Sequence, residues 1–313
     1  MSAALPRVAL IGAGTIGTAW AVVFARAGCE VRAWDADPAA LAAFPGRVAA
    51  VFDALAGTPI AGLPGGAARI QACERLEDAV DGAEWVQEQV AEQLAVKQAV
   101  LARVEAACPA DAVIATSTSG LSQAALAASL QRPERFIVVH PLTPPFLLPV
   151  TEIVTHPGTS DATLDRAYAV MRAVGQKPIR VHGEISGFAM NRIQAAMLNE
   201  MVALVRDGII SAEDADTTLT HGFGLRWAVI GPLAGVDLNA AGGIRQYMER
   251  FGYILDDVAR DRGAAPALTP AAIDALEGSL RARLPLDALP ARLRRRDRAI
   301  GLLRGHLDAM DPV

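Results

Sequence analysis

The segment from residue 7 to residue 35 most constrains what this chain can fold into. A short β-prone run, residues 7–11, leads into the glycine-rich sequence GAGTIG, and a helical stretch continues to residue 27. A second short apolar run then ends in Asp35. Glycines at this spacing between strand and helix, with an acid after the next strand, are typical of a βαβ unit that binds a dinucleotide.

Each residue type in this unit has a physical reason. Gly12 permits a tight turn, Gly14 lets a pyrophosphate approach the backbone, and Gly17 lets helix and strand pack closely. Free N–H groups at the helix start favour phosphate. An acid at position 35 accepts hydrogen bonds from ribose hydroxyls and repels a 2′-phosphate, which favours NAD over NADP. The predicted cofactor site is Gly12, Gly14, Thr15, Ile16, Gly17 and Asp35; the alternative is a glycine turn beside a surface aspartate.

Strands and helices are expected to alternate as far as residue 181, and the pattern is helical after residue 186. This alternation predicts an α/β fold, a Rossmann-type doubly wound and mostly parallel sheet, followed by a smaller all-α domain. The helical patterns are interrupted by glycines, among them those at residues 222–224. We expect an NAD-binding domain over residues 1–185 and a helical substrate and dimerisation domain over residues 186–313.

Charge and cysteine usage exclude several classes of function. The net charge is −5, so neither nucleic acid nor an anionic membrane is an expected partner. The three cysteines are scattered without metal-ligand spacing, which predicts a reducing, cytoplasmic location and no metal site. Residues 8–25 are uncharged and long enough to suggest a membrane helix. Their glycines favour strand, turn and helix instead.

A histidine and a glutamate lie on either side of a proline-rich loop. His140 ends the apolar run 136–139, and Glu152 lies within the run 150–154. Two neighbouring strands would bring imidazole and carboxylate together. This pair suits a general base, because the carboxylate orients the ring and stabilises its cation. The alternative is a core histidine and an ordinary surface glutamate.

Hydroxyl side chains cluster after the apolar run 113–115, in the sequence Thr116-Ser117-Thr118-Ser119. Ligands of α/β sheets bind beyond the carboxyl ends of strands, so Ser117 is a candidate cofactor contact. The alternative is capping of a helix expected over residues 121–130, which is an equally common use of such hydroxyls.

Five motifs follow one another along the chain: GAGTIG with Asp35, EQVAEQLAVK at 88–97, TSTSGL at 116–121, the stretch from His140 to Glu152, and GFAMNRI at 187–193. Together they resemble the 3-hydroxyacyl-CoA dehydrogenase superfamily over almost the whole chain. HPLTPP at 140–145, GFGLRWAVIGPL at 222–233 and a Leu-Asn pair at 238–239 are most similar to its short branch, L-gulonate 3-dehydrogenase and lambda-crystallin. GLRWA and FLLP also resemble the sister group of L-carnitine dehydrogenases.

The resemblance implies an NAD-dependent dehydrogenase and assigns roles to individual residues. In these roles His140 is the general base, Glu152 holds it, Ser119 and Asn191 hydrogen-bond the reacting oxygen, and Glu92 and Lys97 lie near the nicotinamide ribose and amide.

The substrate is expected to be a small L-3-hydroxy acid such as gulonate. CoA-using relatives tend to carry a lysine-rich region after the second strand, whereas residues 49–74 hold no lysine and only Arg69. Arg226 suits a small carboxylate through a two-pronged contact, and an interdomain or dimer ion pair is the alternative. The expected substrate contacts are Ser119, Asn191, Arg226, Asn239 and Thr143, which stands where the branch usually carries Asn.

Two other functions stay open. One is an L-carnitine or L-3-hydroxyacyl-CoA dehydrogenase; a carnitine site needs aromatic or acidic groups, for which Trp227 and Tyr247 are candidates. The other is a non-catalytic NAD-binding or crystallin-like structural protein. The helical half carries more apolar surface than a small domain buries, which predicts a homodimer.

Overall fold

A computed structural model describes residues 5–56 and 63–261, together with scattered positions between 270 and 292. It divides into two compact units, residues 1–197 and residues 198–313. The division falls inside one long helix, α7 (Phe188–Arg206).

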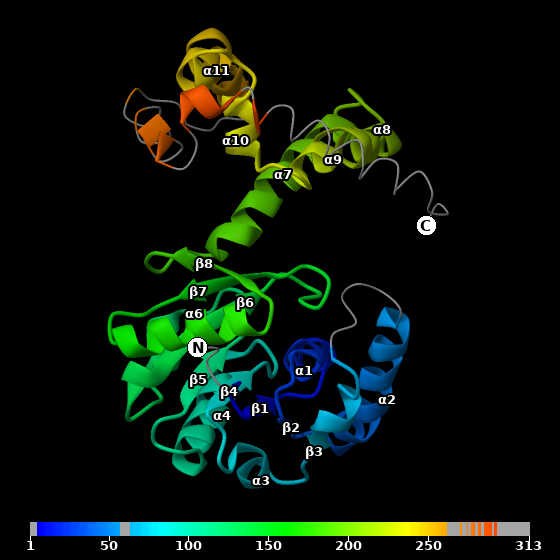
Figure 1. The fold of residues 1–313 in the computed structure, drawn as a ribbon, viewed down its shortest axis with the longest axis vertical. Coiled ribbons are helices and arrows are strands. Elements are labelled where there is room, and N and C mark those ends of the chain that lie inside the picture. The colour runs from blue at the N-terminus through cyan, green and yellow to red at the C-terminus, as the bar shows by residue number, and fades with distance from the viewer. Residues whose placement is uncertain are drawn as a thin grey trace. The chain divides into compact units, whose positions relative to one another are not determined.

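The first unit is built on one eight-stranded sheet of order β3-β2-β1-β4-β5-β6-β7-β8 (Figure 1). All neighbouring strands are parallel except β6 and β7, which are antiparallel. The chain therefore forms the expected mostly parallel, doubly wound sheet, with the strand order reversing between β1 and β4. The strands are β1 (Val8–Ile11), β2 (Val31–Trp34), β3 (Ile70–Ala72), β4 (Trp85–Glu88), β5 (Val113–Thr116), β6 (Phe136–Pro141), β7 (Val150–Val154) and β8 (Lys177–Val181).

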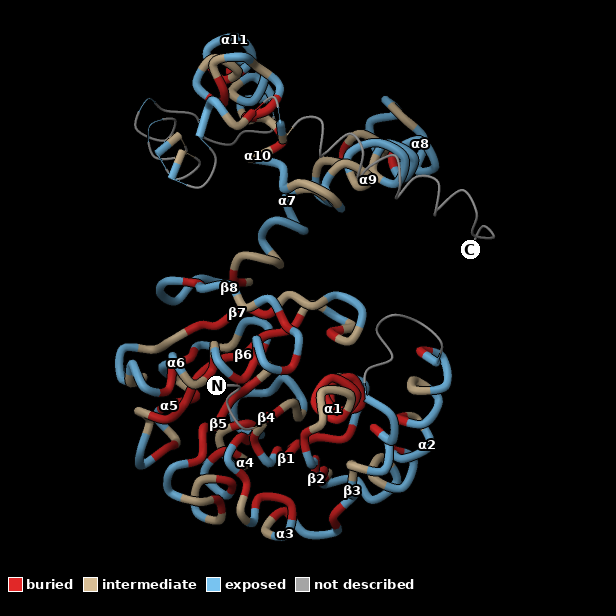
Figure 2. Tube along the Cα trace, viewed as in Figure 1, coloured by how far each residue is buried: buried red, intermediate tan, exposed pale blue. Residues whose placement is uncertain are grey.

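Helices cover both faces of this sheet, because its central strands are apolar on both sides. Val8 and Leu10 of β1 pack on the face of α1, α2 and α6, whereas Ala9 and Ile11 pack on the face of α3, α4 and α5. Figure 2 shows these strands and most of α1 as buried. The helices are α1 (Thr15–Ala27), α2 (Pro38–Leu55), α3 (Leu76–Val80), α4 (Leu94–Ala107), α5 (Gln123–Ala127) and α6 (Asp161–Ala173), with short 3₁₀ turns η1 (Ala67–Arg69) and η2 (Pro133–Arg135).

Two local features differ from expectation. The expected helix over residues 121–130 is shorter, and its cap is Ser122, whose hydroxyl accepts from the amide of Ala125 at 3.2 Å. None of the hydroxyls of residues 116–119 therefore caps α5, although that of Thr118 accepts from the amide of Leu121 at 3.1 Å. The helical pattern is also unbroken at residues 222–224, where α8 (Ala212–Thr217) continues through a π-turn, η3 (Thr218–Phe223), into α9 (Gly224–Trp227).

The π-turn favours glycine at position 224. Its amide donates to the carbonyl of Leu219, five positions back. A Cβ at Gly224 would lie 2.5 Å from the same carbonyl oxygen. The glycine therefore serves the π-turn, a geometry that is frequent at functional sites.

The second unit has a small described core. It contains the end of α7, the helices α8 and α9, and the π-turn η3 between them. It continues with α10 (Pro232–Asp237), α11 (Gly243–Asp261) and the short turn η4 (Leu286–Ala288). Ile244 and Met248 of α11 are buried against partly buried residues of α10. Asp237, fully buried, accepts from the amide of Ile244 at 2.8 Å and pairs with Arg281. Many apolar side chains of this unit stay exposed, among them Val202, Ile209, Tyr253 and Leu255.

One helix in the described part of the chain, α2, is long and apolar enough to cross a membrane by length and composition alone, a test that helices of soluble proteins also pass. Its Phe44, Val48 and Leu55 are buried in the core of the α/β unit. Residues 8–25, by contrast, are the expected strand, turn and helix.

Candidate active site

The glycine-rich turn has the geometry that a dinucleotide phosphate requires. Gly12 has a φ of 110°, and a Cβ there would lie 2.8 Å from the carbonyl oxygen of Gln89. A Cβ at Gly17 would lie 2.0 Å from the carbonyl oxygen of Gly12, so helix and turn touch. A Cβ at Gly14 would meet nothing within 4 Å. The space beside Gly14, at the start of α1 with Thr15 and Ile16, fits a pyrophosphate.

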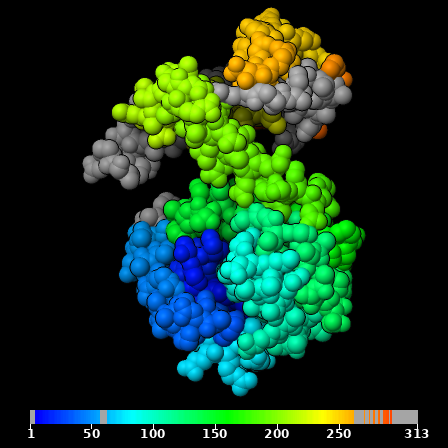
Figure 3. Space-filling model, turned by 180° about the vertical axis from the view of Figure 1, so that it is seen from behind, coloured from blue at the N-terminus to red at the C-terminus, as the bar shows by residue number. Residues whose placement is uncertain are grey.

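Asp35 lies at the end of β2, next to this turn. Its carboxylate accepts from the amides of Ala13 at 2.6 Å and of Asp37 at 2.9 Å. A cavity of about 970 Å³ opens beside it, between Trp34, Leu41, Arg75 and neighbouring residues. The space-filling view shows the dark blue N-terminal residues at the surface between the regions of α2 and α4 (Figure 3). The cavity and the carboxylate fit the adenosine end of NAD.

Two residues that sequence reasoning missed hold the turn. The Nη2 atom of Arg47, from α2, donates to the carbonyl of Ala13 and to that of Ala40 at 3.0 Å. The side-chain amide of Gln89 donates to the carbonyl of Gly12 at 2.7 Å. Only their position next to the turn reveals these roles, because Arg47 lies outside the motifs and the motif that contains Gln89 does not indicate a contact with Gly12.

His140 and Glu152 form the expected pair. They are directly opposite each other in the antiparallel register of β6 and β7. The imidazole Nδ1 and the carboxylate Oε2 are 2.7 Å apart, and both side chains are buried. The ring also lies 5.5 Å from that of Phe188. With Nδ1 held by the carboxylate, Nε2 is the nitrogen left to take a proton.

Glu152 also anchors the start of α7. Its Oε1 accepts from the amides of Ala189 at 2.7 Å and of Met190 at 2.8 Å. Gly187 and Phe188, just before them, have φ of 75° and 48°, a left-handed conformation that glycine adopts freely and that is strained for Phe188. Burial by itself would raise the pKa of Glu152, but the hydrogen bonds from His140, Met190 and Ala189 outweigh it and the pKa is lowered. The carboxylate therefore stays charged and can stabilise an imidazolium.

Ser119 and Asn191 are brought together from β5's loop and α7. The side-chain amide of Asn191 donates to the backbone carbonyl of Ser119 at 3.3 Å, and Ser119 is exposed. These residues and the His140–Glu152 pair all belong to the first unit.

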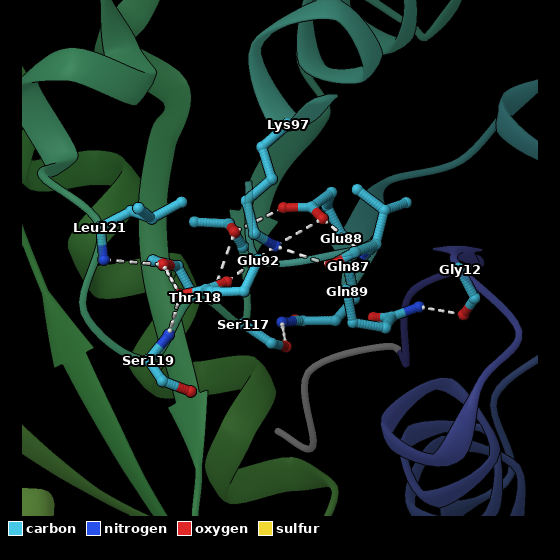
Figure 4. A network of polar contacts seen from close by, with 12 residues as sticks. Gly12, Gln87, Glu88, Gln89, Glu92, Lys97, Ser117, Thr118, Ser119 and Leu121 are labelled. Carbon is cyan, nitrogen blue, oxygen red and sulfur yellow. Dashed lines mark hydrogen bonds and ion pairs between the residues drawn. The ribbon is translucent and has the colours of Figure 1, made fainter. Parts of the chain in front are cut away.

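Glu92 and Lys97 belong to a partly buried polar network (Figure 4). Glu92 accepts from the hydroxyl of Thr118 at 2.5 Å and from the amide of Ser119 at 2.8 Å. These two hydrogen bonds hold the loop that carries Ser119, the residue expected to contact the reacting oxygen of the substrate. The Lys97 ammonium contacts Glu88 at 2.8 Å, Glu92 at 3.4 Å and the carbonyl of Val90 at 3.2 Å.

Lys97 thus donates hydrogen bonds to Glu88 and to the carbonyl of Val90 and forms an ion pair with Glu92, and its side chain is 1% exposed. Glu92, 44% exposed, is the member of the pair that reaches solvent. Glu88, a third residue of this network that the sequence did not predict as part of the site, is fully buried and also accepts from the hydroxyl of Thr116 at 2.5 Å. Its burial raises its pKa even though the charge and hydrogen bond of Lys97 act in the opposite direction.

The other expected substrate residues differ in setting. Thr143 is exposed in the loop between β6 and β7, and Asn239 is exposed just after α10. Arg226 lies on α9 in the second unit, with its guanidinium 5.3 Å from the ring of Phe223. Phe223 in turn stacks on Trp227, with centroids 5.3 Å apart. Arg226 makes no ion pair with the described residues, and a cavity of about 510 Å³ opens beside it.

The described residues contain no group of three or more His, Cys, Asp or Glu side chains that could hold a metal ion.

Comparison with known proteins gives the family of this chain. Residues 7–185 match the NAD binding domain of 3-hydroxyacyl-CoA dehydrogenase, and residues 187–274 match the C-terminal domain of the same family. A lambda-crystallin homolog of Bos taurus is 37% identical over 288 residues, covering 90% of this chain and 88% of that protein. An L-carnitine dehydrogenase of Streptomyces griseus is 37% identical over 273 residues, covering 86% and 80%.

A solved structure has a similar fold. The crystal structure of 5-formyl-3-hydroxy-2-methylpyridine 4-carboxylic acid 5-dehydrogenase, described as an NAD+ dependent dismutase, superposes with a TM-score of 0.75 at 27% identity. It covers 98% of this chain and 100% of its own. The matches span both units. The chain therefore belongs to the 3-hydroxyacyl-CoA dehydrogenase family of NAD-dependent oxidoreductases.

Proposed function

We propose that this protein oxidises the hydroxyl group of a small L-3-hydroxy acid, gulonate-like in size and charge, to the 3-keto acid. The observation that carries the proposal is the buried pair of His140 and Glu152 at 2.7 Å, beside an NAD-binding turn. Bound NAD supplies the hydride acceptor. The protein has to supply a base for the hydroxyl proton and hydrogen bonds for the oxygen.

The residues divide this work between them. Nε2 of His140 takes the hydroxyl proton as the C–H bond loses its hydride and the carbonyl forms. Glu152 stabilises the resulting imidazolium, since its carboxylate is already charged and held by two amides. Ser119 and Asn191 orient the reacting oxygen, and Glu92 holds the Ser119 loop.

A small carboxylate substrate is supported by Arg226. Its guanidinium lacks a carboxylate partner among the described residues, and a planar guanidinium binds a carboxylate through two parallel hydrogen bonds. Arg226→Lys keeps the positive charge but cannot donate two parallel hydrogen bonds to one carboxylate, so KM for the hydroxy acid is expected to rise about tenfold. Unchanged KM would remove Arg226 from the substrate site.

L-Carnitine is the second candidate, and a specific observation favours it. The rings of Phe223 and Trp227 are stacked and partly exposed next to Arg226. Aromatic rings therefore lie beside a guanidinium that can bind the carboxylate of carnitine. Aromatic faces attract a trimethylammonium group. The similarity to L-carnitine dehydrogenases is consistent with this substrate.

The experiment is a panel of gulonate, L-carnitine, L-3-hydroxybutyrate and an L-3-hydroxyacyl-CoA, each with NAD, followed by NADH formation. Turnover of a free hydroxy acid with a much higher kcat/KM than the CoA ester supports the proposal. Tight NADH binding without turnover of any of them would instead favour a structural, crystallin-like role.

We also propose that the protein is a homodimer in the reducing cytoplasm. Exposed apolar residues of α7 and α11, such as Val202 and Leu255, support the dimer, because such clusters mark interaction surfaces. The free, buried thiols of Cys29, Cys73 and Cys108 are compatible with the compartment.

A further inference from the structure

The hydroxyl of Ser117 sits between two nitrogen donors. Ser117 directly follows β5 and is half-buried. Its oxygen accepts from the indole Nε1 of Trp20 at 3.0 Å and from the side-chain amide of Gln87 at 2.8 Å. A serine oxygen has two lone pairs and one hydrogen, so both of its acceptor positions are filled.

The identity of both donors follows from chemistry. An indole nitrogen can only donate. The amide of Gln87 could in principle be turned over, because its oxygen and nitrogen look alike. Here the indole of Trp85 donates to Oε1 of Gln87 at 3.1 Å, which leaves Nε2 to face Ser117 and the carbonyl of Val139 at 3.3 Å. Turning the amide would place donor against donor at Trp85.

The proton of the Ser117 hydroxyl therefore has to point away from both donors. No described residue accepts it. Ser117 lies beyond the carboxyl end of a central strand in the second half of the sheet, β4-β5-β6, where ligands of doubly wound sheets bind. The first half, with Asp35, takes the adenosine, so the second half faces the nicotinamide end.

We propose that Ser117 is a one-way hydrogen-bond donor to an acceptor oxygen in the nicotinamide–ribose half of the cofactor. Gln87, Trp85 and Trp20 are its positioning residues, since they fix the direction of its proton. The proposal rests on NAD binding, and does not depend on which substrate the enzyme oxidises. A donor whose direction is set before binding loses little rotational freedom when the cofactor arrives.

The test compares two ligands, NADH and ADP, by fluorescence and calorimetric titration. ADP carries the adenosine and both phosphates but lacks the nicotinamide nucleoside. Ser117→Ala removes one hydrogen bond, so the Kd of NADH should rise roughly 3- to 10-fold while the Kd of ADP stays within about twofold.

Gln87→Glu tests the direction of the proton. The introduced carboxylate accepts from both Trp85 and Ser117, so the hydroxyl turns inward and is lost to the cofactor. The Kd of NADH should be measured for Gln87→Glu and for the unsubstituted protein over a range of pH. The ratio of the two Kd values should rise between about pH 6 and about pH 9, as the introduced carboxylate ionises. In the Ser117→Ala background the same substitution should add no further loss, because its effect passes through Ser117.

Gln123→Glu is the matched control. Gln123 is equally buried, on α5, and neither its oxygen nor its nitrogen has a hydrogen-bond partner among the described residues. This variant introduces a buried carboxylate without touching Ser117 and should leave NADH binding within about twofold at every pH.

Three results would overturn the proposal. They are an unchanged Kd of NADH in Ser117→Ala, an equal loss of ADP affinity in that variant, and full additivity of the two substitutions. Ser117→Ala only removes an oxygen atom, so it decides the question even if the buried charge of Gln87→Glu lowers the melting temperature too far for titration.

Discussion

Replacing Glu152 by glutamine tests the proposed mechanism most sharply, because it removes a charge and leaves the shape. Oε1 of Glu152 accepts two backbone amides from the start of α7. In Glu152→Gln the side-chain oxygen has to stay on that side, since an NH₂ group would meet two N–H donors there. The new NH₂ group therefore faces Nδ1 of His140, which must become an acceptor.

This rearrangement moves the ring proton of His140 to Nε2, the atom that should take the substrate's proton. Two magnitudes can then be distinguished. Loss of one charge-assisted hydrogen bond costs about 1.5–3 kcal/mol, or roughly 10- to 150-fold in rate. Loss of the base itself costs about 10²- to 10⁴-fold. Since the tautomer withholds the base, we expect kcat to fall by about 10³-fold.

The assay is steady-state NADH formation with saturating NAD and the best substrate of the panel, alongside the Kd of NADH. The Kd should stay within about twofold, because neither side chain belongs to the glycine turn or to the Asp35 site, where the phosphates and the adenosine are expected to bind. His140→Ala should show a similar loss, and the double variant little more, as expected for residues that act as a unit. The control for replacing a carboxylate by an amide is Glu134→Gln, because Glu134 lies on η2 and its side chain reaches solvent.

A fall in kcat of less than about fivefold in Glu152→Gln would refute the reasoning, because neither the charge nor the tautomer would then matter. A loss confined to KM would refute it as well, since a base acts in the transition state.

The remaining predictions concern stability and assembly. Lys97→Met leaves the buried carboxylate of β4 without its cation, so the free energy of unfolding should fall by about 3 kcal/mol in urea titration; a change below about 1 kcal/mol would contradict this. Gly224→Ala should destabilise by roughly 1–3 kcal/mol, because the Cβ meets the carbonyl of Leu219, whereas Gly222→Ala, with open space around it, should be neutral or stabilising. The pKa of Glu152 is lowered on folding, so its contribution to stability is present above the ordinary value of about 4.5 and is lost as the pH falls through the lowered value. The stability difference between the wild-type protein and Glu152→Gln should therefore shrink on acidification, and a difference that stays constant down to about pH 3 would count against the lowered pKa. Sedimentation at micromolar concentration should show a dimer, and a stable monomer would disprove it.

Much of the α/β unit can be predicted from local patterns. Strand, GAGTIG turn, helix and Asp35 follow one another without a gap, and the physical demands on each glycine are local. The pairing of His140 with Glu152 is also predictable, because a hairpin joins them and the antiparallel register sets them opposite. These features depend on residues close in sequence or on the order of strands.

Other features depended on surroundings that no local pattern contains. The serines and threonines after β5 look like caps in the sequence, and only the packed structure shows Ser122 in that role. The glycines at 222–224 predict a break, but the π-turn uses Gly224 to keep the helix continuous. In such cases the neighbours of a side chain in the folded protein decide its structural role, and the conformational preference of the residue alone does not.

The sequence by itself determined the cofactor-binding unit, the family's motifs and the identity of the candidate base. Only the tertiary structure decided that Lys97 is buried between carboxylates, that α7 starts on Glu152, and that Trp20, 97 positions away, donates to Ser117. The physical reason is that backbone conformation follows from nearby residues, whereas burial and hydrogen-bond direction follow from partners that the chain brings together on folding.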